Sequence, residues 1–129
     1  MQWLVWDKGQ RNFSLADCEF AWSSQHKASR IFNYSRASAL RDGKTHPTQK
    51  PVALMVWCLG FAGGDVLDPF IGSGTTAVAC EQLGRKWVGI EISEKYCEIA
   101  AKRIERERQQ LKLFPPEKPT PKPIQETLF

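Results

Sequence analysis

The sequence predicts an α/β fold of the Rossmann-like type with an incomplete sheet. Residues 64–80 read as an apolar strand, a glycine turn and the start of a helix, which is the order in which such folds hold a nucleotide-like ligand. A second apolar run at 87–90 ends in Glu91, an acid placed to accept hydrogen bonds from ribose hydroxyls. Residues 52–59 are almost entirely apolar and predict a buried helix before the first strand.

The remaining elements follow from local patterns. Three short aromatic-rich strands are expected at 2–7, 19–22 and 30–34. The glycine pair at 63–64 is expected to end the first long helix, and Gly84 the helix that continues through 77–83. Ser93 is positioned to cap a last helix that runs to about residue 113. The sequence thus contains two strand–helix units, 66–83 and 87–113.

The composition is ordinary for a single globular domain, with 42% hydrophobic residues and a net charge of +4. No apolar run reaches the roughly 18 residues that a membrane helix needs, and the start of the chain lacks the basic segment of a secretory signal. The four cysteines have no metal-ligand spacing. We therefore expect reduced thiols, no metal site, no membrane partner and a cytoplasmic location.

The glycine turn alone leaves the ligand open. Residues 72–77 also satisfy the dinucleotide pattern G-x-G-x-x-G/A, so a nicotinamide or flavin site is an alternative. The discriminating motif is His-Pro-Thr-Gln-Lys-Pro at 46–51. Followed by Asp-Pro-Phe-x-Gly-Ser-Gly-Thr-Thr at 68–76 and a strand ending in Glu91, it resembles the DNA amino-methyltransferases that modify adenine N6 or cytosine N4, in their branch with permuted motifs. The resemblance spans about residues 2–105.

The resemblance implies a site for S-adenosylmethionine. The turn would surround the amino-acid moiety of the cofactor, and Thr75 and Thr76 open a helix whose free N–H groups favour a carboxylate. Glu91 would bind the ribose, Ile92 would lie against the adenine, and Lys50 would pair with the carboxylate. Asp68 as a helix-capping group and Lys50 as a solvated cation are the alternatives. The predicted cofactor-binding residues are His46, Pro47, Thr48, Gln49, Lys50, Pro51, Asp68, Pro69, Phe70, Gly72, Ser73, Gly74, Thr75, Thr76, Glu91 and Ile92.

One motif of the resembled family has no match here, the catalytic tetrapeptide [D/N/S]-P-P-[Y/F]. The sequence at 68–70 lacks the second proline, and the proline pair at 115–116 has the wrong neighbours. In the family, this tetrapeptide binds the exocyclic amine and stacks on the flipped base. We therefore expect no catalytic residue in this chain and no activity from it alone. The partners implied are double-stranded DNA, bound by the complete enzyme, and a chain that supplies the missing catalytic half.

The resemblance divides the chain into parts. Residues 1–114 are expected to be a partial methyltransferase domain, with edge strands and a loop in 1–45 and the cofactor-binding half in 46–114. The strand at 66–67 would lack its inner neighbour. We expect a mobile loop at 35–45, whose cations either contact DNA phosphates or are solvated. Trp3, Trp6 and Trp22 are expected to pack in the core rather than to stack on bases.

Residues 115–129 predict a disordered tail, because 115–123 hold five of the eight prolines. Two peptides of the pattern Q-x-x-L-F flank this proline-rich segment, at Gln110–Phe114 and at Gln125–Phe129, the latter reading Gln-Glu-Thr-Leu-Phe. The first resembles the peptide with which bacterial replication and repair enzymes bind the sliding clamp. The alternative for this copy is a frayed helix end that packs back on the domain. A non-catalytic module that docks through these peptides is an alternative function.

Overall fold

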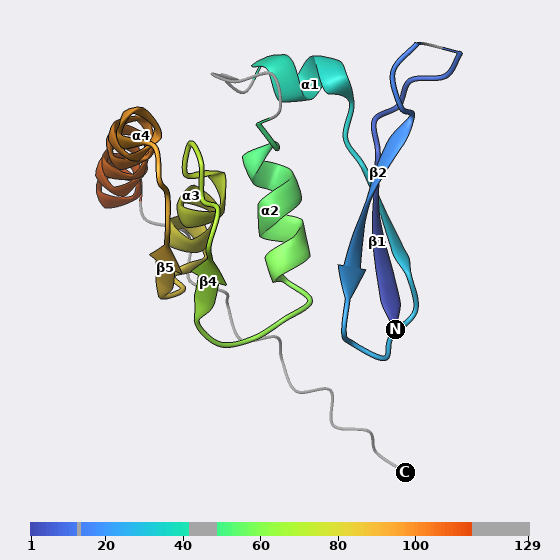
Figure 1. Cartoon of the computed structure of the whole chain (residues 1–129), viewed down its shortest axis with the longest axis horizontal. Helices are drawn as coiled ribbons and strands as arrows, with labels where there is room; N and C mark the ends of the chain where they lie inside the picture. The colour runs from blue at the N-terminus through green and yellow to red at the C-terminus, as the bar shows by residue number, and fades with distance from the viewer. Residues whose placement is uncertain (13, 42–48, 115–129) are drawn as a thin grey trace, which may run out of the picture.

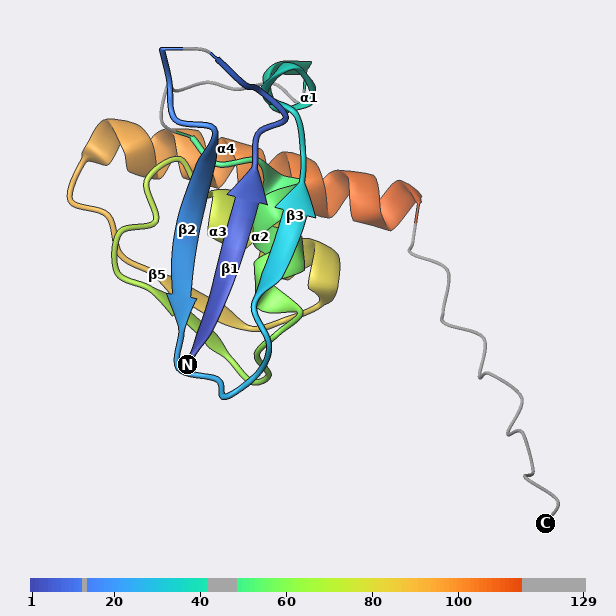
Figure 2. The same cartoon turned by 90° about the vertical axis from the view of Figure 1, so that its right-hand side faces the viewer.

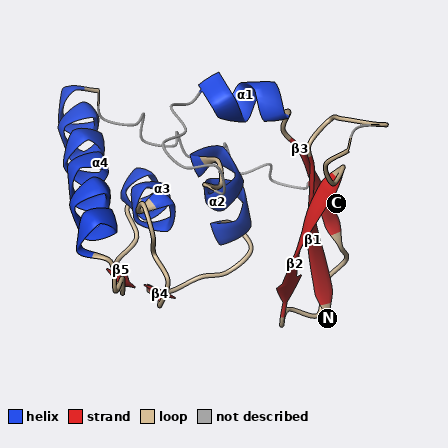
Figure 3. Cartoon of the chain, turned by 45° about the horizontal axis from the view of Figure 1, so that its top comes forward, coloured by secondary structure: helices blue, strands red, loops and turns tan. Residues whose placement is uncertain are grey.

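The computed structural model describes residues 1–12, 14–41 and 49–114. The described elements, in chain order, are β1 (Gln2–Asp7), β2 (Cys18–Ser23), β3 (Arg30–Asn33), α1 (Arg36–Arg41), α2 (Val52–Leu59), β4 (Val66–Asp68), α3 (Thr75–Leu83), β5 (Trp87–Gly89) and α4 (Glu94–Leu113). They form two small sheets with helix α2 between them (Figure 1). Figure 3 shows helices α2, α3 and α4 following one another from the three-stranded sheet outwards.

The three strands predicted in the N-terminal part are present and form one mixed sheet in the order β2–β1–β3. Strand β1 pairs antiparallel with β2 and parallel with β3. Alternate side chains of β1 face α2, and Trp6 is buried there with Leu54 of α2 and Ala39 of α1. The Trp6 indole also donates a hydrogen bond of 2.8 Å to the carbonyl of Tyr34, so its polar edge is satisfied inside the core.

The expected core packing of the other two tryptophans is wrong. Trp3 is 44% exposed and Trp22 is 60% exposed. Trp3 and Trp22 are direct cross-strand partners. Because Trp3 is three residues from Trp6 on the same strand and side chains alternate between faces, both lie on the sheet face opposite Trp6. Figure 2 views this face and shows the described helices behind the sheet. No described element covers these rings.

The prediction of a loop at 35–45 is wrong for residues 36–41, which form helix α1. The hydroxyl of Ser35 accepts a hydrogen bond of 3.1 Å from the N–H of Ser38, three residues on. This is the bond of a helix N-cap, and it stabilises a helix despite the polar composition. The rest of the predicted loop, residues 42–48, lies outside the described residues.

Helix α2 is present, but it is shorter and less buried than predicted. It ends at Leu59 with Gly60 as its C-cap, before the glycine pair that we expected to end it. Of α2, only Leu54 is buried. An apolar cavity of about 470 Å³ lies beside α2, lined by four of its residues and by residues of β1 and β2. The guanidinium of Arg85 donates to the carbonyls of Leu59 and Ala62 at 2.8 Å and so fixes the turn that follows the helix.

The predicted strand–helix units are both present, and β4 and β5 pair in parallel. Gly84 ends α3 in the left-handed conformation, with φ 63°, as expected. Ser93 is the N-cap of α4, but its side chain makes no capping hydrogen bond. Among the described residues β4 pairs only with β5, so the expected gap on its other edge is present. The sheet is therefore incomplete.

The last turn of α4 carries the first Q-x-x-L-F peptide and projects beyond the folded body (Figure 2). Leu113 and Phe114 are 73% and 79% exposed. The alternative that this peptide packs back on the domain is therefore wrong for its Leu-Phe pair. The second copy, together with the rest of 115–129, lies outside the described residues.

Candidate cofactor site

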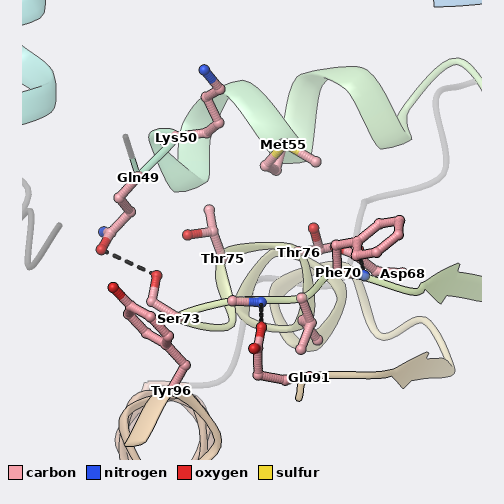
Figure 4. Close-up of a pocket in the computed structure, with 12 residues that line it drawn as sticks. Gln49, Lys50, Met55, Asp68, Phe70, Ser73, Thr75, Thr76, Glu91 and Tyr96 are labelled. Atoms are coloured by element: carbon pink, nitrogen blue, oxygen red, sulfur yellow. Dashed lines mark hydrogen bonds between the residues drawn. The ribbon is translucent and has the colours of Figure 1, made fainter. Parts of the chain in front are cut away.

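Nine of the sixteen predicted cofactor-binding residues line a cavity of about 550 Å³ between the start of α2, the glycine turn and the start of α4. Figure 4 shows Thr75 and Thr76 rising from the start of α3, with Met55 of α2 above them and Tyr96 of α4 to one side. The lining residues are Gln49, Lys50, Met55, Asp68, Phe70, Ile71, Gly72, Ser73, Thr75, Thr76, Glu91 and Tyr96. A cavity of this size is typical of cofactor sites.

The glycine turn requires glycine at its end for two reasons. Gly74 has φ 85°, a left-handed conformation that costs other residues roughly 1–2 kcal/mol. A Cβ on Gly74 would also lie 2.9 Å from the Cβ of Ala100 in α4, closer than packed carbon atoms approach. Ala100 is buried, so neither side can move away without disturbing the packing of α3 on α4. Helix α4 thus determines the shape of the turn.

Glu91 faces the turn from the end of β5. Its Oε2 accepts a hydrogen bond of 2.9 Å from the N–H of Gly72 (Figure 4), and its Oε1 accepts one of 2.9 Å from the N–H of Ser93. These two bonds fix the carboxylate at the wall of the cavity. Each carboxylate oxygen keeps further lone pairs, so the group can still accept hydrogen bonds from a diol.

A residue that the sequence analysis missed supports the turn from behind. The half-buried Arg103 of α4 donates to the carbonyl of Ser73 at 2.7 Å, to the Ser73 hydroxyl at 3.0 Å and to the Thr75 hydroxyl at 3.2 Å. Burial lowers the pKa of its guanidinium below the ordinary value, although the group stays protonated. All three bonds come from Nη1, which carries two hydrogens, so at least one N–H is shared between two acceptors.

The upstream motif reaches the site through its described residues, 49–51. Gln49 accepts a hydrogen bond of 3.3 Å from the Ser73 hydroxyl (Figure 4). Lys50 lines the cavity, but its ammonium forms an ion pair with Glu19 of β2 and points away from Ser73 in Figure 4. In this structure the carboxylate partner of Lys50 is thus a residue of the chain itself, and the alternative of a simply solvated cation is wrong.

Glu19 is held by two cations, since Lys8 also pairs with it at 2.8 Å. Partial burial alone would raise the pKa of Glu19, but the hydrogen bonds from Lys50 and Lys8 outweigh that effect and lower the pKa below its ordinary value of 4.5. Lys50 also lines the apolar cavity beside α2. Lys50, two residues before the first residue of α2, therefore connects this cavity with the N-terminal sheet.

The other predicted residues are placed as follows. Asp68 ends β4, and its Oδ1 accepts a hydrogen bond of 3.0 Å from the N–H of Phe70, so it stabilises the turn rather than capping a helix. Pro69 lies exposed in the same turn, and Pro51 is buried at the N-cap of α2. Ile92 is fully exposed and does not line the cavity. His46, Pro47 and Thr48 lie outside the described residues.

The described segments offer neither a metal site nor a membrane-spanning helix. No group of three or more His, Cys, Asp or Glu side chains in the described segments is placed to hold a metal ion. No helix within those segments is long and apolar enough to cross a bilayer. The four cysteines are free thiols, and burial raises the pKa of the Cys58 and Cys80 thiols, which makes both less reactive.

Comparison with known proteins identifies the family. The family model for N6/N4 DNA methylases matches residues 5–102. The chain is 35% identical to the type II methyltransferase M2.DpnII of Streptococcus pneumoniae over 123 residues, covering 77% of this chain and 46% of that protein. It is 59% identical to M.SmaI of Serratia marcescens over 46 residues, covering 36% of this chain and 16% of that protein. The chain thus spans less than half the length of these relatives.

Solved structures agree with this assignment. The complex of M1.HpyAVI with SAM superimposes with a TM-score of 0.58 at 30% identity, covering 78% of this chain and 60% of that one. TTHA0409 of Thermus thermophilus gives a TM-score of 0.54 at 21% identity, which supports the fold alone. The predicted Rossmann-like methyltransferase fold with an incomplete sheet is confirmed. The chain belongs to the N6/N4 DNA methylase family.

Proposed function

We propose that this chain is the S-adenosylmethionine-binding part of a DNA methyltransferase that acts on the exocyclic amine of adenine or cytosine. The observation that carries the proposal is the Glu91 carboxylate bonded to the N–H of Gly72 at the wall of a cavity of about 550 Å³. An acid at the end of the second strand, facing a glycine turn after the first, suits the ribose of a nucleoside cofactor.

The residues of the cavity suit the different parts of S-adenosylmethionine. Glu91 presents an acceptor to the ribose hydroxyls. The free N–H groups at the start of α3, next to Thr75 and Thr76, favour the cofactor carboxylate, and the bare backbone of Gly72 admits close approach of the ligand. The bound cofactor would supply the methyl group that is transferred. The part of this chain is to bind and orient that group at the cavity.

Methyl transfer also needs a DNA base as acceptor and a catalytic segment that this chain does not supply. The relatives named above are type II methyltransferases, which suggests a restriction-modification role on double-stranded DNA in the cytoplasm. The chain has no match to the catalytic tetrapeptide, so transfer to a flipped base requires a second part of the enzyme that supplies it. We therefore expect this chain to bind cofactor but not to methylate DNA alone.

Isothermal titration of the purified chain with S-adenosylmethionine tests the proposal, with NAD as the competing ligand class. We expect saturable one-site heat with S-adenosylmethionine and none with NAD. The Glu91→Ala variant should bind S-adenosylmethionine much more weakly. Heat with NAD alone would favour the nicotinamide alternative, and no heat from a folded chain would reject cofactor binding by this part of the enzyme.

A second candidate function is docking to a bacterial sliding clamp through Gln110–Phe114. The observation that favours it is the exposure of Leu113 and Phe114 at the C-terminal end of α4. An exposed Leu-Phe pair suits an apolar pocket on a partner, and Gln110 at its start offers an amide to the rim of such a pocket. Gln125–Phe129 offers the same pattern a second time.

Capture of purified clamp by the immobilised chain tests the docking function, and two variants separate the two peptides. The double variant Leu113→Ala/Phe114→Ala removes the first peptide, and a chain ending at residue 124 removes the second. Loss of capture with only one variant identifies the active copy. Undiminished capture by a chain carrying both changes would reject docking through these peptides.

A further inference from the structure

The N-terminal sheet has one apolar face that no described element covers. Trp3 and Val5 of β1 are direct partners of Trp22 and Phe20 of β2, so all four side chains share one face. Ile31 of β3 joins them as the partner of Val5. Phe20, Ile31 and Trp22 are 60–67% exposed. Trp3 and Phe20 contact each other edge to face, with ring centroids 6.3 Å apart, but nothing described lies over them.

The β4–β5 sheet repeats this asymmetry. Leu67 and Val88 are direct partners on one face, and they are 66% and 61% exposed. Their neighbour Ile90, two residues after Val88, is also exposed. On the other face Trp87 packs against the core formed by α3 and α4. In the part of the chain that the structure describes, both sheets therefore bury one face against helices and leave the other apolar face bare.

Two physical expectations are violated together. Parallel strands normally have both faces covered, and an exposed apolar patch of several large side chains marks an interaction surface. The free edge of β2 and the free edge of β4 also lack strand partners among the described residues. A partner that paired the free strand edges and covered the exposed apolar side chains would have to add at least one strand to an edge and an apolar layer to the bare faces.

We propose that two bare faces are the docking surface for the remaining part of the methyltransferase. One is made by Trp3, Val5, Phe20, Trp22 and Ile31, and the other by Leu67 and Val88. This inference rests on the proposed function and names its partner surface. The occupant is a polypeptide with a strand for a free edge and amphipathic helices for the faces. The relatives supply the argument for it, because this chain accounts for only 46% of M2.DpnII and 60% of M1.HpyAVI.

Co-expression with a defined probe tests the inference. The probe is the part of M2.DpnII that the similarity to this chain leaves uncovered, produced as a separate polypeptide alongside the full chain. The test variant is Phe20→Thr/Trp22→Thr, because threonine removes the apolar surface while favouring the strand. The control is Leu40→Gln, which changes an exposed apolar residue of α1 outside the surface. Circular dichroism of each variant establishes that it is folded.

We expect a 1:1 complex with the unaltered chain and with the control, and an affinity at least about tenfold lower with the double variant. Absence of a complex with the unaltered chain, or equal affinity for the double variant, would overturn the inference. A homodimer dispersed by the same substitutions would overturn it in favour of a second copy of this chain. Titration of the chain alone with S-adenosylmethionine separates the outcomes, since cofactor can bind whether or not the partner docks.

Discussion

The glycine turn and the N-terminal sheet differ in how far this chain completes them. The turn is supported on several sides by the same chain: by Ala100 and Arg103 of α4, by Glu91 after β5, and by Gln49 before α2. Within the described residues, the three-stranded sheet is covered on one face only. The contacts that shape the turn thus all lie within residues 49–103, although the sheet of the same domain is incomplete.

Substitution at Gly74 should break the turn most severely. Gly74→Ala forces a side chain into a left-handed conformation and against Ala100, which we expect to lower the free energy of unfolding by about 3 kcal/mol and to abolish measurable cofactor binding. Urea unfolding and calorimetric titration measure the two effects. Gly63→Ala is the matched control, because its added Cβ would meet nothing within 4 Å; similar losses in both variants would contradict the explanation.

Substitution of Glu91 should weaken binding while leaving the fold. Glu91→Gln removes the negative charge of the carboxylate that accepts the hydrogen bond from the N–H of Gly72. The same carboxylate would accept hydrogen bonds from the ribose hydroxyls. A hydrogen bond to a charged group contributes roughly 1.5–3 kcal/mol, so we expect the Kd for S-adenosylmethionine to rise about 10- to 100-fold. Glu94→Gln, an exposed acid in the first turn of α4, should leave the Kd unchanged. An equal rise in both variants would assign the effect to net charge.

Arg103 tests whether support of the turn alone affects binding, because it does not line the cavity and contacts Ser73 and Thr75 of the turn. Arg103→Met removes the donor to Ser73 and Thr75, and we expect an approximately tenfold rise in Kd, equivalent to about 1.4 kcal/mol. Arg103→Lys should restore part of the affinity, since lysine can still donate to one acceptor. Lys102→Met changes an exposed neighbour on the same helix and serves as the control. Loss of stability with unchanged affinity would limit Arg103 to a structural role.

The N-terminal sheet should show the smallest effect, a dependence of its stability on pH. The pKa of Glu19 is lower in the folded protein than its ordinary value of 4.5. Its ion pairs therefore stabilise the fold above that value, and the contribution is lost as the pH falls through the folded pKa. Because the side chain is partly exposed, we expect less than about 1 kcal/mol. Urea unfolding at about pH 7 and about pH 3 measures the change in the free energy of unfolding between the two pH values. This change should be smaller for Glu19→Gln than for the unaltered chain; an equal change would assign the pH dependence to other acids.

Sequence patterns predicted the turn well because its requirements are local. The glycines, the acid after the second strand and the upstream motif are each defined by spacing within a short segment. Arg103 escaped this reasoning because it lies in a helix rich in arginine and lysine. No pattern distinguishes it from Arg106 or Arg108; only the packing of α4 on α3 brings its guanidinium to Ser73. The Ser35 cap of α1 was readable in principle, since a serine directly before the first residue of a helix is a capping signal.

The burial of the tryptophans, in contrast, could not be predicted from local sequence. Burial was predicted for Trp3, Trp6 and Trp22 from the size of their side chains, yet only Trp6 is buried. Strand alternation places Trp6 on the face toward α2 and the other two on the bare face. Whether a strand residue is buried depends on what covers its face, and this information lies in other elements rather than in the strand itself.

The ion pair between Lys50 and Glu19 has a consequence for both regions. Lys50 lines the cofactor cavity and the apolar cavity beside α2, while its ammonium is bound to β2. Thermodynamic coupling between two sites is reciprocal. A ligand carboxylate that drew the ammonium away from Glu19 would remove one of the two ion pairs on this residue of β2, and by the same free energy a change that weakened the Lys50–Glu19 pair would favour the ligand. The N-terminal sheet would then be coupled to binding at a turn that lies outside it.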